Sequence, residues 1–150
     1  MKRITNAFLR RELYTMNENH NYSDLLNFNT SQITNLKKIF LYDFDFNHLE
    51  FIKDWNVENC IDCFGMFEKC INLKELDPLS NWNVENVMDF SKMFAFTKIC
   101  DVSPLENWNV NQNANFSGMF HNTFIKDFTP LQKWFPNKEI SDIESILRGP

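Results

Sequence analysis

The sequence of 150 residues has few glycines and prolines, 3 and 5 respectively. That scarcity excludes collagen-like repeats and flexible linkers, which need far more of these residues. No apolar run approaches the roughly 20 residues that span a bilayer as a helix. Basic residues are also outnumbered, since 15 Lys and Arg face 20 Asp and Glu and leave a formal net charge of −5. General attraction to nucleic acid or anionic membranes normally needs the opposite sign, so we expect no direct nucleic acid binding and no membrane association.

The N-terminus shows no export signal. Met1-Lys2-Arg3 is basic, yet only Ile4 to Leu9 separates it from Arg10, and a secretory apolar segment needs about 7–15 residues. We therefore expect a cytoplasmic protein. Residues 6–16 are expected to form an amphipathic helix, whose apolar side holds Ile4, Phe8, Leu9, Leu13 and Met16.

Hydrophobic residues are abundant and occur in a repeat. They make up 43% of the chain, with 16 Phe and 4 Trp, which is enough to pack the core of a single domain. The motif Asp/Asn-Trp-Asn-Val occurs around Trp55, Trp82 and Trp108, and the successive intervals from Trp55 to Trp134 are 27, 26 and 26 residues. Counting back 27 residues from Trp55 reaches Phe28. The spacing predicts four units over residues 28–133, an N-terminal cap over 1–27 and a C-terminal cap over 134–150.

Each unit has the same internal pattern. Seven places after the aromatic residue stands an Asp or Asn, a natural cap for a helix N-terminus; these are Asn35, Asp62, Asp89 and Asn115. Apolar residues then follow at the helical spacing i, i+3, i+4, for example Phe90, Met93 and Phe94. The pattern predicts a two-turn helix in each unit. A second apolar set lies near the aligned prolines and predicts a strand around residues 73–76 and their equivalents. The strand must be very short, because proline has no amide to donate to a ladder.

Neither a two-turn helix nor so short a strand can bury its apolar face alone, but stacked copies form a continuous core. We therefore expect an α/β fold, a short leucine-rich-repeat-like solenoid of about four helix-strand units with terminal helical caps. Ile140, Ile143, Ile146 and Leu147 predict the closing helix, which Gly149-Pro150 would end. The expected structural anchors are Trp55, Trp82, Trp108, Met66, Phe67, Met93, Phe94, Met119 and Phe120.

The stretch from Trp82 to Phe94 reads Trp-Asn-Val-x-Asn-Val-x-Asp-Phe-Ser-x-Met-Phe. This pattern resembles the BspA-like leucine-rich-repeat family, in the version abundant in mycoplasma-type and other bacterial surface proteins. The resemblance covers residues 28–134. It implies a leucine-rich-repeat-like solenoid and a role in protein recognition or adhesion rather than catalysis.

Cysteines and asparagines are the other candidates for a special role. Cys60-x-x-Cys63, followed by Cys70, has a spacing that suits zinc. In the repeat register, however, Cys60 and Cys63 occupy apolar core positions, where a reduced cysteine packs as a small hydrophobe. We favour reduced structural cysteines, with Cys100 in solvent, over a metal site or a disulfide, and expect no cofactor. A column formed by Asn29, Asn56, Asn83 and Asn109 is expected to be buried and to bond the backbone of neighbouring coils.

Catalytic signals are sparse, because His20, His48 and His121 share no register and no glycine-rich phosphate loop is present. We therefore expect no enzyme.

The most suggestive surface feature is an aligned set of acids, Glu75, Asp101 and Asp127, which we call the acidic row. Adjacent strands lie about 4.8 Å apart, and like charges that close repel. Such a row indicates either a solvated face that tolerates charge or a recognition surface for a basic partner. In the second case, the partner-binding residues are the acidic row with Lys74, Lys126, Pro78 and Pro104 at its margins.

The function that the sequence favours is non-catalytic binding of a protein partner through one face of the solenoid. One alternative is a small cytoplasmic acidic inhibitor, immunity, anti-defence or anti-CRISPR-like, of a basic nucleic-acid-handling enzyme. The missing export signal, the two caps and the acidic row favour this alternative. A second alternative, suggested by the family resemblance, is a fragment of a surface adhesin. The sequence assigns no oligomeric state.

Overall fold

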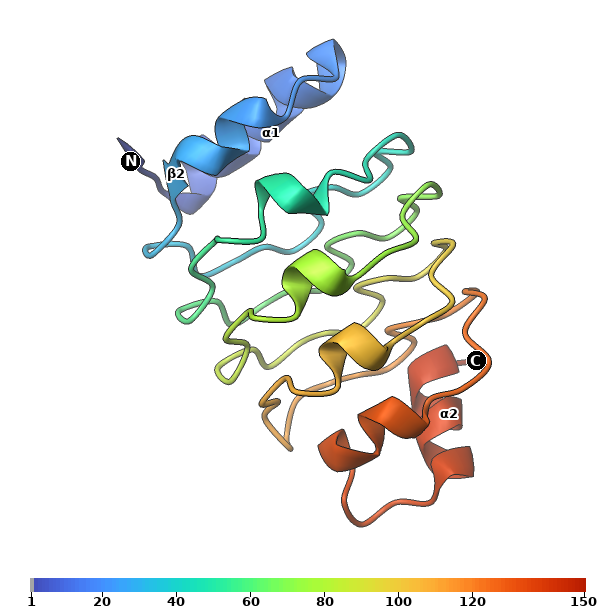
Figure 1. Ribbon diagram of the computed structural model, residues 1–150. Coiled ribbons are helices and arrows are strands. Elements are labelled where there is room, and N and C mark those ends of the chain that lie inside the picture. The colour runs from blue at the N-terminus through green and yellow to red at the C-terminus, as the bar shows by residue number, and fades with distance from the viewer. Residues whose placement is uncertain (1) are drawn as a thin grey trace.

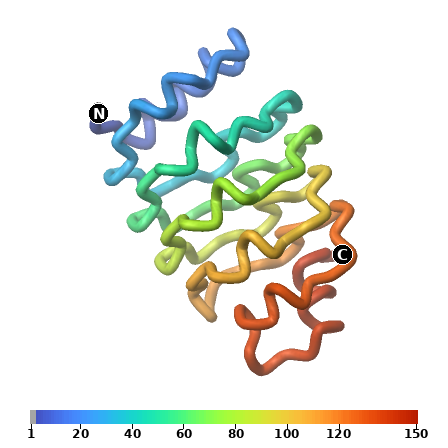
Figure 2. The backbone as a smooth tube through the Cα atoms, in the orientation of Figure 1, coloured from blue at the N-terminus to red at the C-terminus, as the bar shows by residue number. Residues whose placement is uncertain are grey.

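The chain winds into successive coils that lie side by side between two terminal helices (Figures 1 and 2). This architecture is seen in a computed structural model that describes residues 2–150, so Met1 of the expected N-terminal cap lies outside the described residues. Isolated parallel bridges join Asn35 to Asp62, Asp62 to Asp89 and Asp89 to Asn115, one residue from each unit. Each coil therefore corresponds to one unit of the sequence repeat.

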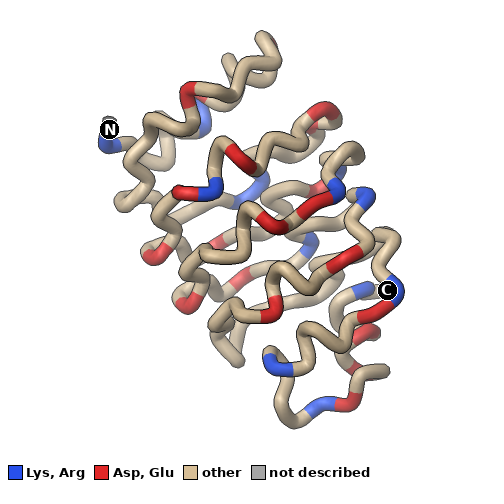
Figure 3. Tube along the Cα trace, viewed as in Figure 1, with Lys and Arg blue, Asp and Glu red and all other residues tan. Residues whose placement is uncertain are grey.

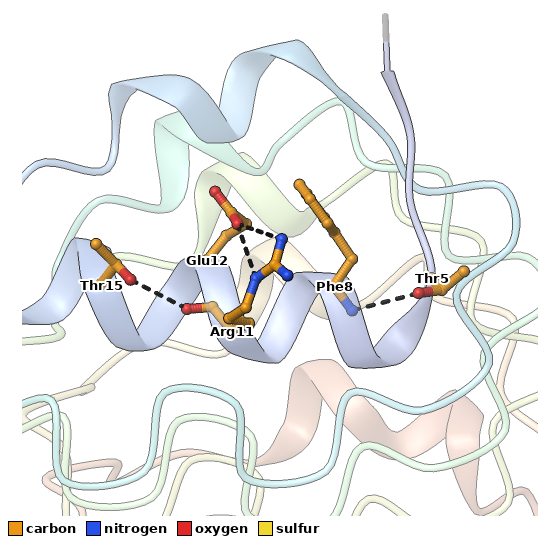
Figure 4. A network of polar contacts seen from close by, with 5 residues as sticks. All are labelled: Thr5, Phe8, Arg11, Glu12 and Thr15. Atoms are coloured by element: carbon orange, nitrogen blue, oxygen red, sulfur yellow. Dashed lines mark hydrogen bonds and ion pairs between the residues drawn. The ribbon is translucent and has the colours of Figure 1, made fainter.

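The N-terminal end of the stack is covered by helix α1 (Asn6–Asn19), which extends three residues beyond the predicted end at Met16. The helix begins after Thr5, whose side chain accepts a hydrogen bond from the Phe8 amide at 3.2 Å (Figure 4). Figure 4 also shows the Arg11–Glu12 ion pair of 3.1 Å on this helix. The opposite side of α1 buries apolar residues against the stack, namely Leu9, Leu13 and Met16.

Short elements join α1 to the first coil. Strand β1 (Lys2–Arg3) pairs in parallel with strand β2 (Phe28–Asn29), and the 3-10 helix η1 (Ser23–Asn27) leads directly into β2. Within residues 2–150, no helix is both long enough and apolar enough to cross a membrane.

The two-turn helices predicted inside each unit are wrong. In the second coil, every second amide from Cys63 to Lys69 donates to a carbonyl of the next coil at 2.8–2.9 Å, beginning with Cys63 to Asp89. The amides between them turn back within their own coil, as Met66 does to the Cys63 carbonyl at 3.1 Å. The segment is therefore a row of tight turns that forms a ladder with its neighbour.

Backbone conformation explains why no helix forms there. Each coil has two residues with positive φ, four places apart: Lys38 and Tyr42, Gly65 and Lys69, Lys92 and Phe96, and Gly118 and Asn122. A right-handed helix cannot continue through a left-handed residue. The apolar residues at i, i+3 and i+4 still face the interior, because the turns bring them to the same side of the coil.

All nine repeat anchors are buried: Trp55, Trp82, Trp108, Met66, Phe67, Met93, Phe94, Met119 and Phe120. The phenylalanine rings stack from coil to coil, with centroids 5.5 Å apart between Phe67 and Phe94 and 5.4 Å apart between Phe94 and Phe120. The indole of each of these tryptophans donates to a backbone carbonyl 29 or 30 residues earlier in the chain, as Trp82 does to Ile52 at 3.1 Å. These contacts join each coil to its neighbour through both packing and hydrogen bonds.

The strands predicted around residues 73–76 are also absent. A single backbone bond joins neighbouring coils in this segment, such as Lys98 to the Leu73 carbonyl at 2.9 Å. The chain then enters 3-10 helices η2 (Leu49–Phe51), η3 (Asp77–Leu79), η4 (Ser103–Leu105) and η5 (Thr129–Trp134). Proline stands in the first turn of the last three, where its fixed φ and missing amide fit.

Helix α2 (Ile140–Arg148) covers the other end of the stack. It accepts the amides of Gly118 and Phe120 on its Ile146 and Leu147 carbonyls, both at 2.9 Å. The approach is close, since a Cβ added to Gly149 would lie 3.0 Å from the Gly118 Cα. The stack of coils therefore ends against this helix. The assignment of the stack of coils to the leucine-rich-repeat class stays a prediction.

Because the phenylalanine column joins all the coils, Phe94→Ala is expected to lower the free energy of unfolding by about 3–5 kcal/mol. Urea denaturation of the purified variant measures this change. The control is Phe124→Ala, since Phe124 is 64% exposed; it should change stability by less than about 0.5 kcal/mol. Equal effects of the two substitutions would contradict this account of the core.

Thr30 takes the place that valine has in the other coils, at Val57, Val84 and Val110. Its buried hydroxyl has no hydrogen-bond partner within the described part of the chain. Thr30→Val is therefore expected to raise the free energy of unfolding by about 1 kcal/mol or more, measured by urea denaturation. In the control, Thr97→Val, the lost hydroxyl donates to the Phe94 carbonyl at 2.8 Å, so no gain is expected. A destabilised Thr30→Val protein would contradict the prediction.

Candidate functional site

The cysteines do not form a metal-binding group. The Sγ atoms of Cys60 and Cys63 lie 3.6 Å apart, and the thiol of Cys70 bonds the Phe40 carbonyl at 3.2 Å. All four cysteines are free, three of them buried and Cys100 exposed. The hydrogen bond between Cys63 and Cys60, together with burial, raises the pKa of Cys63. Among the described residues, no three His, Cys, Asp or Glu side chains lie close enough together to hold a metal ion.

The asparagine column was predicted incorrectly. Asn56, Asn83 and Asn109 are exposed and Asn29 is half-buried, because each follows a buried aromatic residue and points to the opposite side of the chain. The oxygens of Asn29, Asn56 and Asn83 accept an amide two residues on in their own coil, at 3.0–3.3 Å. Bonds to the neighbouring coil come instead from other asparagines, Asn59 to the Ser31 carbonyl and Asn86 to the Glu58 carbonyl.

Asp62 and Asp89 also cap turns rather than helices. Each carboxylate accepts the amide two residues on, Asp62 from Phe64 at 2.9 Å and Asp89 from Ser91 at 2.8 Å. Such Asx turns favour tight bends over helices. These two acids are therefore explained by the local backbone.

The acidic row of Glu75, Asp101 and Asp127 is fully on the surface. Two of its members support the chain: Asp101 accepts the Ser103 amide and Asp127 accepts the Thr129 amide, both at 2.8 Å. The backbone bond holds the pKa of Asp127 below its ordinary value. In the described residues Glu75 makes no such bond, so its carboxylate is left to solvent.

The surroundings of the acidic row are of mixed charge. Lys74 and Lys126 are exposed and each directly precedes a member of the row, while Pro78 and Pro104 are half-buried. No ion pair among the described residues involves these lysines. Figure 3 shows acidic and basic positions spread over every coil. The row is therefore not part of a uniformly acidic face.

An apolar surface that the sequence analysis missed lies next to the row, at the tips of the coils. We call it the tip ridge, and it consists of Tyr42, Phe44, Ile71, Phe96 and Phe124. Tyr42 is 54% exposed, Phe44 49%, Ile71 44% and Phe124 64%. The repeat register is the signal that could have found them, since these residues stand 14 or 16 places after the aromatic residue that begins each unit.

The backbone conformation at the tips directs these side chains outward. Tyr42 and Phe96 have φ values of 63° and 60°, a conformation that is rare for bulky residues and marks a tight turn. The Lys69 ammonium lies 4.7 Å from the Tyr42 ring centroid and 5.6 Å from that of Phe96. The Asn72 side chain bonds the Phe44 carbonyl at 3.1 Å. Neighbouring tips are thus connected by cation–π contacts and by a hydrogen bond.

A cleft of about 590 Å³ lies at the C-terminal end of the stack, between the fourth coil and α2. Its apolar lining includes Ala114, Phe116, Phe135 and Ile146, and Lys138 is the charged residue in its wall. Three other cavities on the described chain are smaller, at about 210–300 Å³. Sequence reasoning gave no indication of this cleft, because it depends on how α2 packs.

A buried polar pair joins the residue before η1 to the tip of the first coil. The hydroxyl of Tyr22 donates a hydrogen bond to the Asp43 carboxylate, and both residues are buried. Burial raises the pKa of Tyr22 and also that of Asp43, against the opposing effect of the Tyr22 hydrogen bond on Asp43. The His48 ring packs 5.3 Å from that of Tyr22. This pair faces the core and acts as a structural junction.

The raised pKa of Asp43 predicts a pH dependence of stability. Its carboxyl ionises less readily in the folded protein than at its ordinary value of 3.8. The free energy of unfolding therefore loses a contribution as the pH rises through and above that value. Asp43→Asn keeps an oxygen for the Tyr22 hydroxyl but does not ionise. Urea denaturation should show the stability of the wild type, relative to Asp43→Asn, falling as the pH rises above about 4. The control is Asp45→Asn, an exposed neighbour, which should show no comparable trend; a wild-type advantage that grows with pH would contradict the prediction.

Comparison with known proteins adds the family. No curated protein and no solved structure matches the chain. Residues 7–146 match the family described as "Mycoplasma protein of unknown function, DUF285", which is related to the BspA-like surface-protein repeats. Because the match spans nearly the whole stack and both terminal helices, the chain belongs to the DUF285 family.

Proposed function

We propose that this protein is a non-catalytic binding protein that recognises another protein through the tip ridge and the acidic row beside it. The observation that carries the proposal is the register of the exposed apolar side chains. Half of the eight large hydrophobic residues that stand well exposed on the described chain belong to the tip ridge. Exposed apolar side chains that gather on one surface mark interaction sites.

The chemistry of the surface favours a protein as the partner. Aromatic residues are enriched in the centres of protein interfaces, where a polar rim surrounds them. Here Ile71 and Phe124 belong to the apolar ridge, and a member of the acidic row follows each of them in the chain, Glu75 four residues after Ile71 and Asp127 three residues after Phe124. A matching partner would present an apolar patch with basic groups along one side. Because lysines stand between the acids, the partner's basic groups would pair with individual carboxylates and would not respond to the net charge of the face.

A binding role also fits the placement of the reactive groups. The titratable pair Tyr22–Asp43 is buried, as are three of the four cysteines. The wall of the large cleft holds a lysine but no Asp, Glu, His or Cys among its described residues. General acid–base or nucleophilic catalysis needs such groups within reach of a substrate.

The test is affinity capture from cell lysate with purified protein, followed by binding measurements on each identified partner. A ridge variant carries Phe44→Ser, Ile71→Ser and Phe124→Ser. A row variant carries Glu75→Gln, Asp101→Asn and Asp127→Asn, in which the asparagines keep the oxygens that accept the Ser103 and Thr129 amides. The matched control neutralises three exposed acids elsewhere, Glu58, Glu85 and Glu106, each changed to Gln.

The ridge variant is expected to bind the partner at least about tenfold more weakly than the wild type. The row variant should lose less affinity, and the control should bind as the wild type does. Thermal melts verify that each variant folds. Equal binding by all three variants and the wild type would reject the tip ridge as the site. Affinity that survives high salt counts against the purely electrostatic inhibitor alternative. Binding to host matrix proteins would instead support the adhesin alternative.

A further inference from the structure

The backbone bridges between coils follow a fixed pattern up to the fourth coil. At the last step, Asn115 donates its amide to the Met88 carbonyl at 2.9 Å and accepts the Phe90 amide at 2.8 Å. At all three steps the groups used on the preceding coil are the carbonyl before and the amide after its bridged residue. The bridged residue of the next coil accepts that amide, and the donor to that carbonyl is Ile61, Met88 or Asn115. For a next step beyond Asn115, those two groups are the Ala114 carbonyl and the Phe116 amide.

Both of these groups are unpaired. Helix α2 accepts the amides of Gly118 and Phe120, but none of its described carbonyls accepts the Phe116 amide. Within residues 2–150 no donor bonds the Ala114 carbonyl and no acceptor bonds the Phe116 amide. Ala114 and Phe116 are half-buried and buried, and unpaired backbone groups at such positions are costly.

The opposite end of the same column is closed. The amides of Thr34 and Asn35 both donate to the Asn6 side-chain oxygen, at 3.1 and 3.4 Å, and the Asn6 amide group donates to the Thr34 hydroxyl at 2.9 Å. A residue of α1 thus caps the N-terminal edge of the column. Among residues 2–150, no side chain caps the open C-terminal edge in this way.

The open edge faces the cleft between the fourth coil and α2, which Ala114 and Phe116 both line. Its volume of about 590 Å³ is within the range of cavities that bind ligands. Phe135 and Ile146 add apolar wall. The exposed residue Lys138 also lines the cleft and has no ion-pair partner in the described chain. The cleft therefore combines two backbone hydrogen-bonding groups, an apolar pocket and one positive charge.

We propose that this cleft binds an extended peptide segment of a partner protein, which adds one further step to the bridge column. One peptide residue donates its amide to the Ala114 carbonyl and accepts the Phe116 amide. A neighbouring apolar side chain fills the pocket, and a carboxylate of the segment pairs with Lys138. Adding a strand to an exposed edge is a recurring mode of peptide recognition. This inference rests on the proposed function and adds to it a second place at which a partner protein binds.

The probe is a phage-displayed library of random peptides, selected on the wild-type protein, from which one enriched peptide is synthesised with a fluorophore. Ser145→Trp places a large side chain in the cleft wall. The matched control is Ser141→Trp, one turn earlier on α2, exposed and outside the cleft lining. Fluorescence polarisation is expected to show binding at least about tenfold weaker for Ser145→Trp and within about twofold for Ser141→Trp.

Two further measurements test the backbone step itself. Methylating the peptide nitrogen that donates to Ala114 should weaken binding at least about tenfold, whereas methylating a nitrogen outside the bridge should not. In hydrogen exchange, the Phe116 amide should exchange faster than those of Gly118 and Phe120 in the free protein, and should slow when peptide binds. A Phe116 amide already as protected as Gly118 would overturn the proposal.

Other outcomes also reject it. An unenriched library, or a peptide that binds Ser145→Trp as well as the wild type, excludes the cleft as a peptide site. A concentration-dependent dimer that protects the Phe116 amide and is lost in Ser145→Trp would replace the peptide with a second copy of the chain. If a captured partner still depends on the tip ridge while no peptide binds, the proposed function stands and this inference fails. Loss of both would reject the proposed function as well.

Discussion

The hydrogen bonds that each coil gives to the next coil determine the rest of this structure. Because every second amide of the turn row crosses to the neighbour, the coils must keep one register, and equivalent residues must lie above one another. The rings of Phe67, Phe94 and Phe120 then stack nearly parallel, with interplanar angles of 7° and 9°. Their centroid spacing of 5.4–5.5 Å exceeds the roughly 4.8 Å between adjacent backbones, so the rings are offset, the arrangement that aromatic pairs prefer.

A ladder of this kind has two edges, and the backbone groups at each edge either find a hydrogen-bond partner or stay unpaired. Unpaired edges invite another chain to pair with them. The N-terminal edge is closed by β1, α1 and the side chain of Asn6. The C-terminal edge is closed by α2 only from Gly118 onward, because a helix offers few free carbonyls at its end. The difference between a capping side chain and a capping helix thus leaves an open step at Ala114 and Phe116.

The sequence revealed the repeat but not the conformation inside it. The tryptophan spacing of 26–27 residues is also the spacing of the bridged residues Asn35, Asp62, Asp89 and Asn115. The i, i+3, i+4 pattern, by contrast, fits a helix and a row of turns equally well. Gly65 and Gly118 share one column, which points to a left-handed position, yet Lys38 and Lys92 occupy that column elsewhere and hide the signal. The tip ridge escaped notice because its positions repeat while its residue types change, as at Tyr42, Lys69 and Phe96.

The same local chemistry limits what the acidic charge can mean for function. Asp62, Asp89, Asp101 and Asp127 each accept a backbone amide two residues on, so turn formation alone accounts for a carboxylate or amide oxygen at these places. The net charge of −5 is therefore in part a consequence of how the coils turn. Within the described residues, Glu75 accepts no such amide, and Phe124 of the tip ridge is 64% exposed. A binding role is accordingly better supported by the apolar tips than by the charge of the chain.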